Sequence, residues 1–304
     1  MSTPPAGPPN RTLLAVPNVS EGRDTGAIQA IARAFDSRLL DVHTDPDHHR
    51  SVFTLAGAAG HLAYQVRDGA EQAIRRIDLN RHQGIHPRIG AIDVAPIVYL
   101  DDADRGAACA EALVLADLLG HELSLPVFLY GALGGGRTRA EIRRGGPQAL
   151  ARRMAALELT PDFGPPTELH PTAGAVLVAA RPPLVAFNVQ LKPPATEQDA
   201  RAIAAKIREG GPEGLPSVRA LGLFLSRQGV AQVSANVEDH RASPLRDVVA
   251  AVARHAEPQS AELVGLAPKA ALDGFPDDLP VANRKLIEDA LQCVENALET
   301  AQAE

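Results

Sequence analysis

The order of strand-like and helix-like segments repeats in the two halves of this chain, and this repeat restricts the fold more than any other feature. In the first half we expect β-α-β-β-α-β, at residues 12–18, 26–35, 38–42, 51–56, 62–77 and 91–100. In the second half we expect the same order, at residues 184–191, 197–208, 218–225, 230–236, 245–255 and 262–266. Similar segments occur at the end of the first strand of each half, Val16-Pro17-Asn18-Val19 and Ala186-Phe187-Asn188-Val189. The pattern predicts an α+β fold of two ferredoxin-like subdomains related by internal duplication. The alternative is a chance alignment of ordinary α/β patterning with itself.

Helix caps and connecting segments complete the expected organisation. Asp24 and Thr196 precede the first helix of each half, where their side chains can cap it. Between the halves we expect a helix at residues 105–119 and a strand at residues 125–130. The expected domains are a disordered leader at 1–11, an N-terminal subdomain at 12–180, a C-terminal subdomain at 181–272 and a helical extension at 273–304.

Composition argues against several classes of protein. The chain has 304 residues and a formal net charge of −7, which disfavours broad binding to nucleic acid or to a membrane surface. No apolar run has the length of a signal peptide or of a bilayer-spanning helix. Cys109 and Cys293 stand alone, which is typical of a reducing compartment. We therefore expect a cytoplasmic protein that acts on small molecules.

The segment at residues 84–94 carries the strongest candidate for chemistry. His86 and Arg88 stand on a short turn that contains glycine and proline, just before an apolar segment. An imidazole beside a cation on a rigid turn suits proton transfer near neutral pH. The alternative is a surface loop in which both side chains face water.

Three other segments have the composition of binding loops. Residues 134–137, three glycines and an arginine, can cradle an anion through backbone N–H groups or can serve as a linker. Residues 161–174 are rich in proline and glycine, and such a loop can lie across a cleft between domains. Residues 43–49 alternate histidine with aspartate, which suggests a metal site. Neighbours on an extended strand point to opposite faces, so we favour a polar active-site loop or a solvated turn there.

Short motifs along the chain resemble those of the formiminotransferase family, the glutamate formimidoyltransferases. They occur in the family's order between about residue 12 and about residue 272. The motifs are Val-Pro-Asn-Val-Ser-Glu-Gly-Arg at 16–23, Leu-Leu-Asp-Val at 39–42, His-Pro-Arg-Ile-Gly-Ala-Ile-Asp-Val at 86–94, Leu-Tyr-Gly at 129–131, Pro-Asp-Phe-Gly-Pro at 161–165, Ala-Phe-Asn-Val at 186–189, Ala-Gln-Val-Ser at 231–234 with Asn236, and Leu-Val-Gly-Leu at 263–266. The cyclodeaminase domain of the fused members of the family is missing from this sequence.

The resemblance implies a function as well as a fold. Members of the family move a formimino group between N-formimino-L-glutamate and tetrahydrofolate in histidine degradation, with tetrahydrofolate as a co-substrate in a channel between the subdomains and without a metal. The catalytic histidine of the family falls on His86. One imidazole with a pKa near 6.5 can take a proton from the attacking nitrogen and then deliver one to the departing amine, which is worth roughly 10²–10⁴ in rate.

The expected binding residues lie in both halves. Arg50 and Arg88 are candidates for the glutamate carboxylates, because a guanidinium binds a carboxylate with two parallel hydrogen bonds. The other expected substrate-binding residues are Asn18, His43 and Asn188. The folate-binding loop of the family maps onto Gly164, Pro165, Pro166, Thr167, Glu168, Leu169, His170, Pro171, Thr172, Ala173 and Gly174. We also expect a homodimer.

The chain departs from the family pattern beside the expected catalytic residue. Ile85 stands where the family has glutamate, His43 where the animal enzymes have an aspartate, and His49 where an asparagine is expected. The loop also has Thr172 and Ala173 where the animal enzymes have an aromatic residue. Two alternatives to the transferase therefore stay open, namely a folate-binding protein without this activity and a one-carbon transferase that uses a different amino acid.

Overall fold

The chain forms mixed helices and sheets in a computed structural model that describes residues 12–35, 39–84 and 87–303. The strands are β1 (Thr12–Ala15), β2 (Asn18–Val19), β3 (Leu39–Asp45), β4 (Arg50–Ala58), β5 (Ile92–Val98), β6 (Val127–Leu129), β7 (Val176–Arg181), β8 (Val185–Leu191), β9 (Val218–Leu225), β10 (Val230–Val237), β11 (Pro258–Leu263) and β12 (Val281–Ala282). The helices are α1 (Thr25–Ala34), α2 (Leu62–Arg76), α3 (Arg105–His121), α4 (Arg139–Arg143), α5 (Gly146–Ala155), α6 (Glu197–Ile207), α7 (Leu245–Ala253) and α8 (Ile287–Ala303). The short 3-10 helices are η1 (Leu79–Arg81), η2 (Asp102–Asp104), η3 (Gly131–Gly134) and η4 (Lys269–Leu272). No helix in these ranges is both long and apolar enough to cross a membrane.

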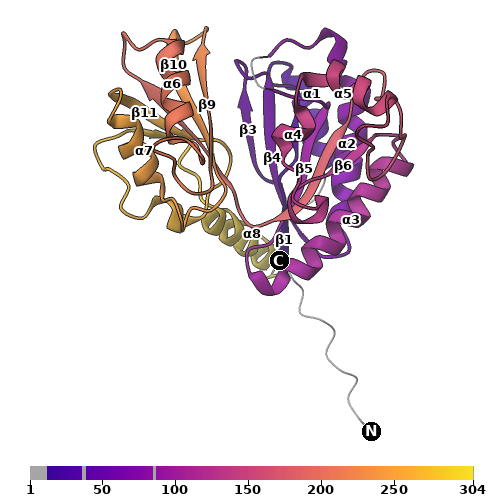
Figure 1. The fold of residues 1–304 in the computed structure, drawn as a ribbon. Helices are drawn as coiled ribbons and strands as arrows, with labels where there is room; N and C mark the ends of the chain where they lie inside the picture. Colours follow the sequence, from indigo (N-terminus) through magenta and orange to yellow (C-terminus); the bar gives the residue numbers. More distant parts are fainter. Residues whose placement is uncertain (1–11, 36–38, 85–86, 304) are drawn as a thin grey trace. The chain divides into compact units, whose positions relative to one another are not determined.

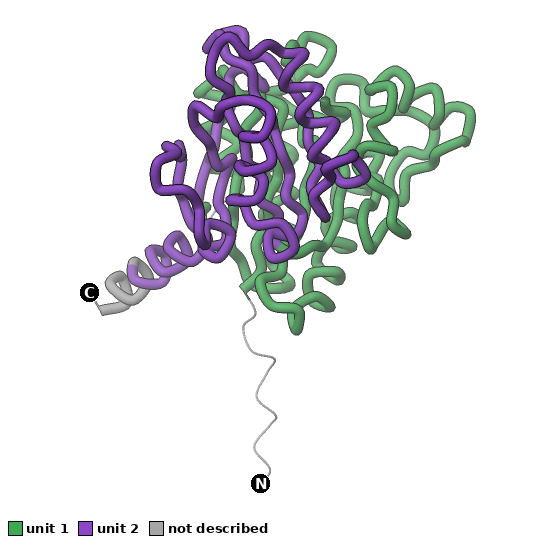
Figure 2. The backbone as a smooth tube through the Cα atoms, turned by 60° about the vertical axis from the view of Figure 1, so that its left-hand side comes forward, with its two compact units in different colours: residues 1–39, 49–182 green, residues 40–48, 183–304 purple. Residues whose placement is uncertain are grey.

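The described residues divide into two compact units, coloured green and purple in Figure 2. Unit 1 lies within residues 1–39 and 49–182, and unit 2 lies within residues 40–48 and 183–304. The chain therefore contributes one short internal segment, residues 40–48, to unit 2 long before the rest of that unit begins.

Unit 1 contains a sheet in which β1 pairs with both β4 and β5 in antiparallel fashion. The sheet order runs β1-β4-β2-β5-β7-β6, and the last two strands continue the sheet beside β5 in parallel. Helices α1, α2 and α3 are associated with this sheet (Figure 1). Gly69 of α2 lets the helix approach Phe35, because a Cβ atom there would lie 2.1 Å from the Phe35 ring. The Phe35 ring in turn packs 5.0 Å from that of Phe53 on β4, so α1, α2 and the sheet share one core.

Unit 2 contains a sheet in the order β12-β11-β8-β10-β9, with α6 and α7 on one face. Alternate residues of β8, β10 and β11 enter the core with these helices. Gly222 of β9 allows close contact with α6, because a Cβ atom there would lie 2.0 Å from the backbone nitrogen of Arg201. Thr196 begins α6 by accepting the N–H of Asp199, as its sequence position predicts.

The three central strands of each sheet pair in the same order, which confirms the predicted α+β fold of two ferredoxin-like subdomains. The first strand of each repeat lies between the third and the fourth in antiparallel pairing, in the orders β4-β1-β5 and β10-β8-β11. Both sheets also contain strands outside the two repeats. These are β6, which confirms the strand expected at residues 125–130, and β7 in one sheet, and β12 in the other.

Some elements differ from the expected segments for local reasons. The strand expected at residues 12–18 is divided into β1 and β2 at Val16 and Pro17, where proline has no N–H to donate to a ladder. The strand expected at residues 38–42 continues as β3 to Asp45, so His43 lies on a strand and not in a turn. Residues 281–282, within the helical extension expected at 273–304, form β12, and α8 begins at Ile287.

Candidate functional site

Arg88 makes hydrogen bonds to the backbone of the same segment that contains the expected catalytic residue, His86. Ile85 and His86 lie outside the described residues, but both flanks are described. The guanidinium of Arg88 donates to the carbonyl oxygens of Gly84, at 3.1 Å, and of His82, at 2.9 Å. Arg88 therefore holds the backbone on the N-terminal side of His86 in addition to any role toward a ligand.

A buried carboxylate anchors the other flank. Asp93 on β5 is 1% exposed, and its Oδ1 atom accepts the backbone N–H of Ile89 at 2.8 Å. Its Oδ2 atom accepts a charged hydrogen bond from Arg143 of α4. An ion pair this deeply buried has little competition from water, so it ties α4 and the end of the His-Pro-Arg segment to β5.

The predicted folate-binding loop joins the same segment at its C-terminal end. Gly174 has φ +71°, and a Cβ atom there would lie 2.0 Å from the carbonyl oxygen of Ile89. The N–H of Ala175 donates to Ile89 O at 2.9 Å, and the N–H of Ala91 donates to Ala173 O at 2.9 Å. Two segments that are about 80 residues apart in the sequence are thus bonded backbone to backbone.

The loop has fixed ends and an exposed middle. Gly164, with φ +78°, lies so close to the carbonyl oxygen of Leu125 that a Cβ atom would come within 2.2 Å of it. His170 closes the other end, where its Nδ1 atom accepts the N–H of Ala173 at 3.0 Å and burial lowers the pKa of its ring. Between these ends Pro166, Thr167 and Glu168 are exposed. Fixed ends with exposed side chains between them suit a loop that contacts a ligand.

A carboxylate and two histidines lie next to the His-Pro-Arg segment in unit 1. His49 has its Nε2 atom 3.0 Å from Oε1 of Glu21 and its Nδ1 atom 3.0 Å from the carbonyl oxygen of Gln83. The His82 ring stacks on the His49 ring with 4.1 Å between centroids, and its Nε2 atom lies 3.0 Å from His49 O.

In this cluster the surroundings favour a neutral His82 ring and an ionised Glu21 carboxylate. Burial, aided by the charges of Arg88 and His49, lowers the pKa of His82 to about 4, so its ring is neutral at pH 7. Burial alone would raise the pKa of Glu21, but the N–H groups of Asp24 and Arg23 and the His49 ring together lower it. The site therefore combines an ionised carboxylate with a neutral imidazole.

The remaining predicted residues of unit 1 lie at strand ends. Asn18 begins β2, and its side-chain amide donates to the carbonyl oxygen of Val16 at 3.0 Å. Arg50 begins β4, directly after His49. β2 pairs with β4 in antiparallel register, with Asn18 opposite Val52 and Val19 opposite Ser51, so Val19 is the residue of β2 that lies nearer in register to Arg50.

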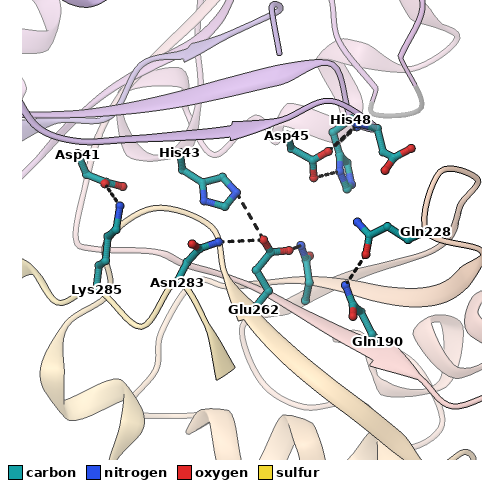
Figure 3. A network of polar contacts seen from close by, with 11 residues as sticks. Asp41, His43, Asp45, His48, Gln190, Gln228, Glu262, Asn283 and Lys285 are labelled. Atoms are coloured by element: carbon teal, nitrogen blue, oxygen red, sulfur yellow. Dashed lines mark hydrogen bonds and ion pairs between the residues drawn. The ribbon is translucent and has the colours of Figure 1, made fainter. Parts of the chain in front are cut away.

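The two predicted substrate-binding residues of unit 2 lie near one carboxylate (Figure 3). The Nε2 atom of His43 lies 3.9 Å from Oε1 of Glu262, and the amide of Asn188 donates to Oε2 of Glu262 at 3.3 Å. The amide of Asn283 donates to Oε1 at 3.1 Å. The structure therefore brings His43 and Asn188 together through Glu262.

Charged pairs flank His43 along β3 (Figure 3). Asp41 accepts a hydrogen bond from Lys285 at 2.6 Å, and Asp45 is bonded to the His48 ring. Burial opposes the charge on Asp45, but the bond to His48 lowers its pKa. In the described part of the chain no three His, Cys, Asp or Glu side chains converge as a metal site.

Three residues of these clusters were missed by the sequence reasoning. Glu21 stands inside the Val-Pro-Asn-Val motif region, and His82 stands just before the His-Pro-Arg segment, so proximity to motifs was their available signal. Glu262 stands between Ala261 and Leu263, both in the core, and strand alternation places it on the opposite face. The contact between His43 and Glu262 on that face depends on the path of residues 40–48, which the sequence pattern does not reveal.

Two family models match the chain and together span most of it. The formiminotransferase domain, N-terminal subdomain, matches residues 12–181, and the formiminotransferase domain matches residues 186–276.

Some similar proteins match this chain over most of their length, and others over about half of it. A glutamate formimidoyltransferase of Streptococcus pyogenes is 32% identical over 274 residues, which cover 86% of this chain and 91% of the relative. A glutamate formimidoyltransferase of Thermoplasma acidophilum is 33% identical over 272 residues, or 84% of this chain and 88% of the relative. A formimidoyltransferase-cyclodeaminase of Gallus gallus is 36% identical over 279 residues, or 86% of this chain and 51% of the relative. The chain thus spans about half the length of this last relative.

Proposed function

Because this chain belongs to the formiminotransferase family, we propose that it is a glutamate formimidoyltransferase that moves a formimino group between N-formimino-L-glutamate and tetrahydrofolate. The observation that carries the proposal is the near full-length match to two proteins named glutamate formimidoyltransferase. The reaction would belong to histidine degradation, and a cytoplasmic homodimer stays a prediction.

His86 is the general acid and base of this proposal. It removes the proton from the attacking nitrogen of tetrahydrofolate as that nitrogen bonds to the amidine carbon. It then delivers the proton to the departing glutamate nitrogen as the old carbon–nitrogen bond breaks. One proton is taken and one returned, so the enzyme ends the cycle unchanged. The anchored flanks at Arg88 and Asp93 support this role, since a proton carrier needs a fixed backbone.

The substrate-binding roles follow from charge. Arg50 and Arg88 of unit 1 would bind carboxylates of the amino-acid substrate, and Asn18 of the same unit is a further substrate-binding residue of this proposal. His43 and Asn188 are the other substrate-binding residues of this proposal. Tetrahydrofolate would contact residues 164–174.

One buried atom of unit 1 fits a ligand that carries N–H groups, as the reduced pteridine ring does. The Nδ1 atom of His82 is buried and has no hydrogen-bond partner among the described residues. Since Nε2 of the neutral ring faces a carbonyl oxygen, Nδ1 is an acceptor. A donor from a bound ligand would satisfy it.

The test compares purified wild type with His86→Ala in formimino transfer and in tetrahydrofolate binding. We expect transfer by the wild type, a loss of at least about 10²-fold in the variant, and unchanged binding. His121→Ala is the matched control, because its ring is 71% exposed on α3. Wild type that binds tetrahydrofolate without transfer would instead support the folate-binding alternative. Transfer only from another amino-acid derivative would support the third hypothesis.

A further inference from the structure

Glu262 occupies an unusual position for a carboxylate in unit 2. Its neighbours Ala261 and Leu263 are each 1% exposed and pack in the core with α6 and α7. Glu262 therefore lies on the other face of the sheet, where its side chain is only 20% exposed. A carboxylate with so little access to water needs hydrogen-bond donors or a positive charge nearby.

Two amides fix the orientation of this carboxylate. Asn188, which is 2% exposed, donates to one oxygen, and Asn283 donates to the other. One oxygen is held from β8 and the other by the residue that follows β12, so the carboxylate plane has little freedom to rotate. Neither amide brings a charge, so the negative charge of Glu262 is not neutralised by them.

His43 is the basic group that faces this charge. Its ring is 7% exposed, and its Nε2 atom points toward Oε1 of Glu262 (Figure 3). The carboxylate oxygen 3.9 Å from Nε2 attracts a proton on that nitrogen, while burial of the ring opposes its charge, so the nearby carboxylate is the group that offsets the cost of burying a cation here.

The other charged groups beside His43 are already paired in this network. Asp41 and Asp45 lie two residues away on the same face of β3. Lys285 neutralises Asp41, and His48 is bonded to Asp45. Glu262 is therefore the acidic group in the network that acts most directly on His43.

We propose that Glu262 is a positioning residue of the transferase, which keeps a proton on Nε2 of His43 so that His43 meets an anionic group of the substrate as a cation. This proposal rests on the proposed function, in which His43 binds the amino-acid substrate. It assigns selectivity for the anionic amino-acid derivative to a pair of residues, one on β3 and one on β11.

The direct test follows the titration of the His43 ring by nuclear magnetic resonance with nitrogen-15-labelled histidine. The resonance is identified by its loss in His43→Gln. In Glu262→Gln we expect the titration midpoint of His43 to fall by about one pH unit, because the isosteric amide keeps the shape and removes the charge. Ser260→Ala, on the same face of β11, is the matched control and should leave the midpoint unchanged. An unchanged midpoint in Glu262→Gln would overturn the proposal.

Steady-state kinetics provide the functional readout. Glu262→Gln should raise KM for N-formimino-L-glutamate by up to about tenfold at a pH above the wild-type midpoint of His43, with kcat and KM for tetrahydrofolate changed less than about threefold. Glu262→Asp, which keeps the charge, should recover part of the lost affinity. If Glu262→Gln does not fold, this aspartate variant carries the test, with a smaller shift in the same direction. Equal losses in Glu262→Asp and Glu262→Gln would show a merely structural role and overturn the proposal.

The two measurements separate the two proposals. A wild type without formimidoyltransferase activity would contradict the proposed function, whereas the titration would still decide whether Glu262 sets the charge of His43.

Discussion

Oε1 of Glu21 lies 3.0 Å from Nε2 of His49, and the same oxygen accepts the backbone N–H groups of Arg23 and Asp24. One carboxylate oxygen therefore connects the segment that leads into α1 with the residue that precedes β4. His49 in turn stacks on His82, so Glu21 is linked to the flank of the His-Pro-Arg segment.

Glu21→Gln should destabilise the protein by about 1–2 kcal/mol at pH 7, because charged hydrogen bonds are replaced by neutral ones. The folded-state pKa of Glu21 is lower than its ordinary value of 4.5. Its contribution is therefore present above pH 4.5 and is lost as the pH falls through the folded pKa. Urea unfolding at pH 7 and at pH 3 measures this. An equal loss at both pH values would contradict the electrostatic explanation.

His82 should make the protein less stable in mild acid. Its pKa falls from 6.5 to about 4 on folding, so the neutral ring is favoured in the folded state. Stability is then complete above pH 6.5 and declines as the pH drops toward 4. After allowance for solvent screening of a half-buried ring, we expect about 1–2 kcal/mol over this range. Urea unfolding of His82→Gln should show a smaller slope between pH 6.5 and 4, whereas His121→Gln should keep that of the wild type.

Asp93→Asn should lower the free energy of unfolding by about 3–5 kcal/mol, because it leaves the buried charge of Arg143 without its carboxylate partner. The matched control is Glu71→Gln, which breaks an exposed pair with Arg75 on α2 and should cost less than about 0.5 kcal/mol. Chemical denaturation of both variants gives the comparison. Similar costs for the two would mean that the Asp93 pair does not anchor the segment.

Gly174→Ala should cost at least about 3 kcal/mol, since it combines a left-handed backbone with a Cβ atom 2.0 Å from Ile89 O. Gly210→Ala is the control that measures only the cost of the left-handed backbone conformation, without a steric clash. Gly210 has φ +81° with nothing within 4 Å of the added atom, so its variant should cost about 1–2 kcal/mol. Thermal unfolding compares the two. We also expect weaker tetrahydrofolate binding in Gly174→Ala, measured by calorimetry, because the loop loses its anchor beside β5.

The amino-acid sequence by itself determined the repeated elements and the family. The strand predicted at residues 218–225 is β9 with the same bounds, and Asp24 caps α1 through the N–H of Ala27 as predicted. These features depend on residues within a few positions of one another, namely side-chain alternation, caps and turns, so local sequence is sufficient to reveal them. The ordered motifs revealed the family, which the matches confirm. The roles of His86 and of the other site residues stay predictions.

Only the tertiary structure decided which distant side chains meet. Residues 40–48 belong to unit 2, and this path brings His43 to Glu262, which is 219 positions further along the chain. Likewise Asp93 meets Arg143 across 50 positions, and Gly174 meets Ile89 through backbone atoms that carry no sequence signal of their own. Local periodicity shows which face of a strand a residue occupies, but the partner on that face depends on how the whole chain packs. The charge environment of the candidate site was therefore a property of the folded protein that its motifs alone did not disclose.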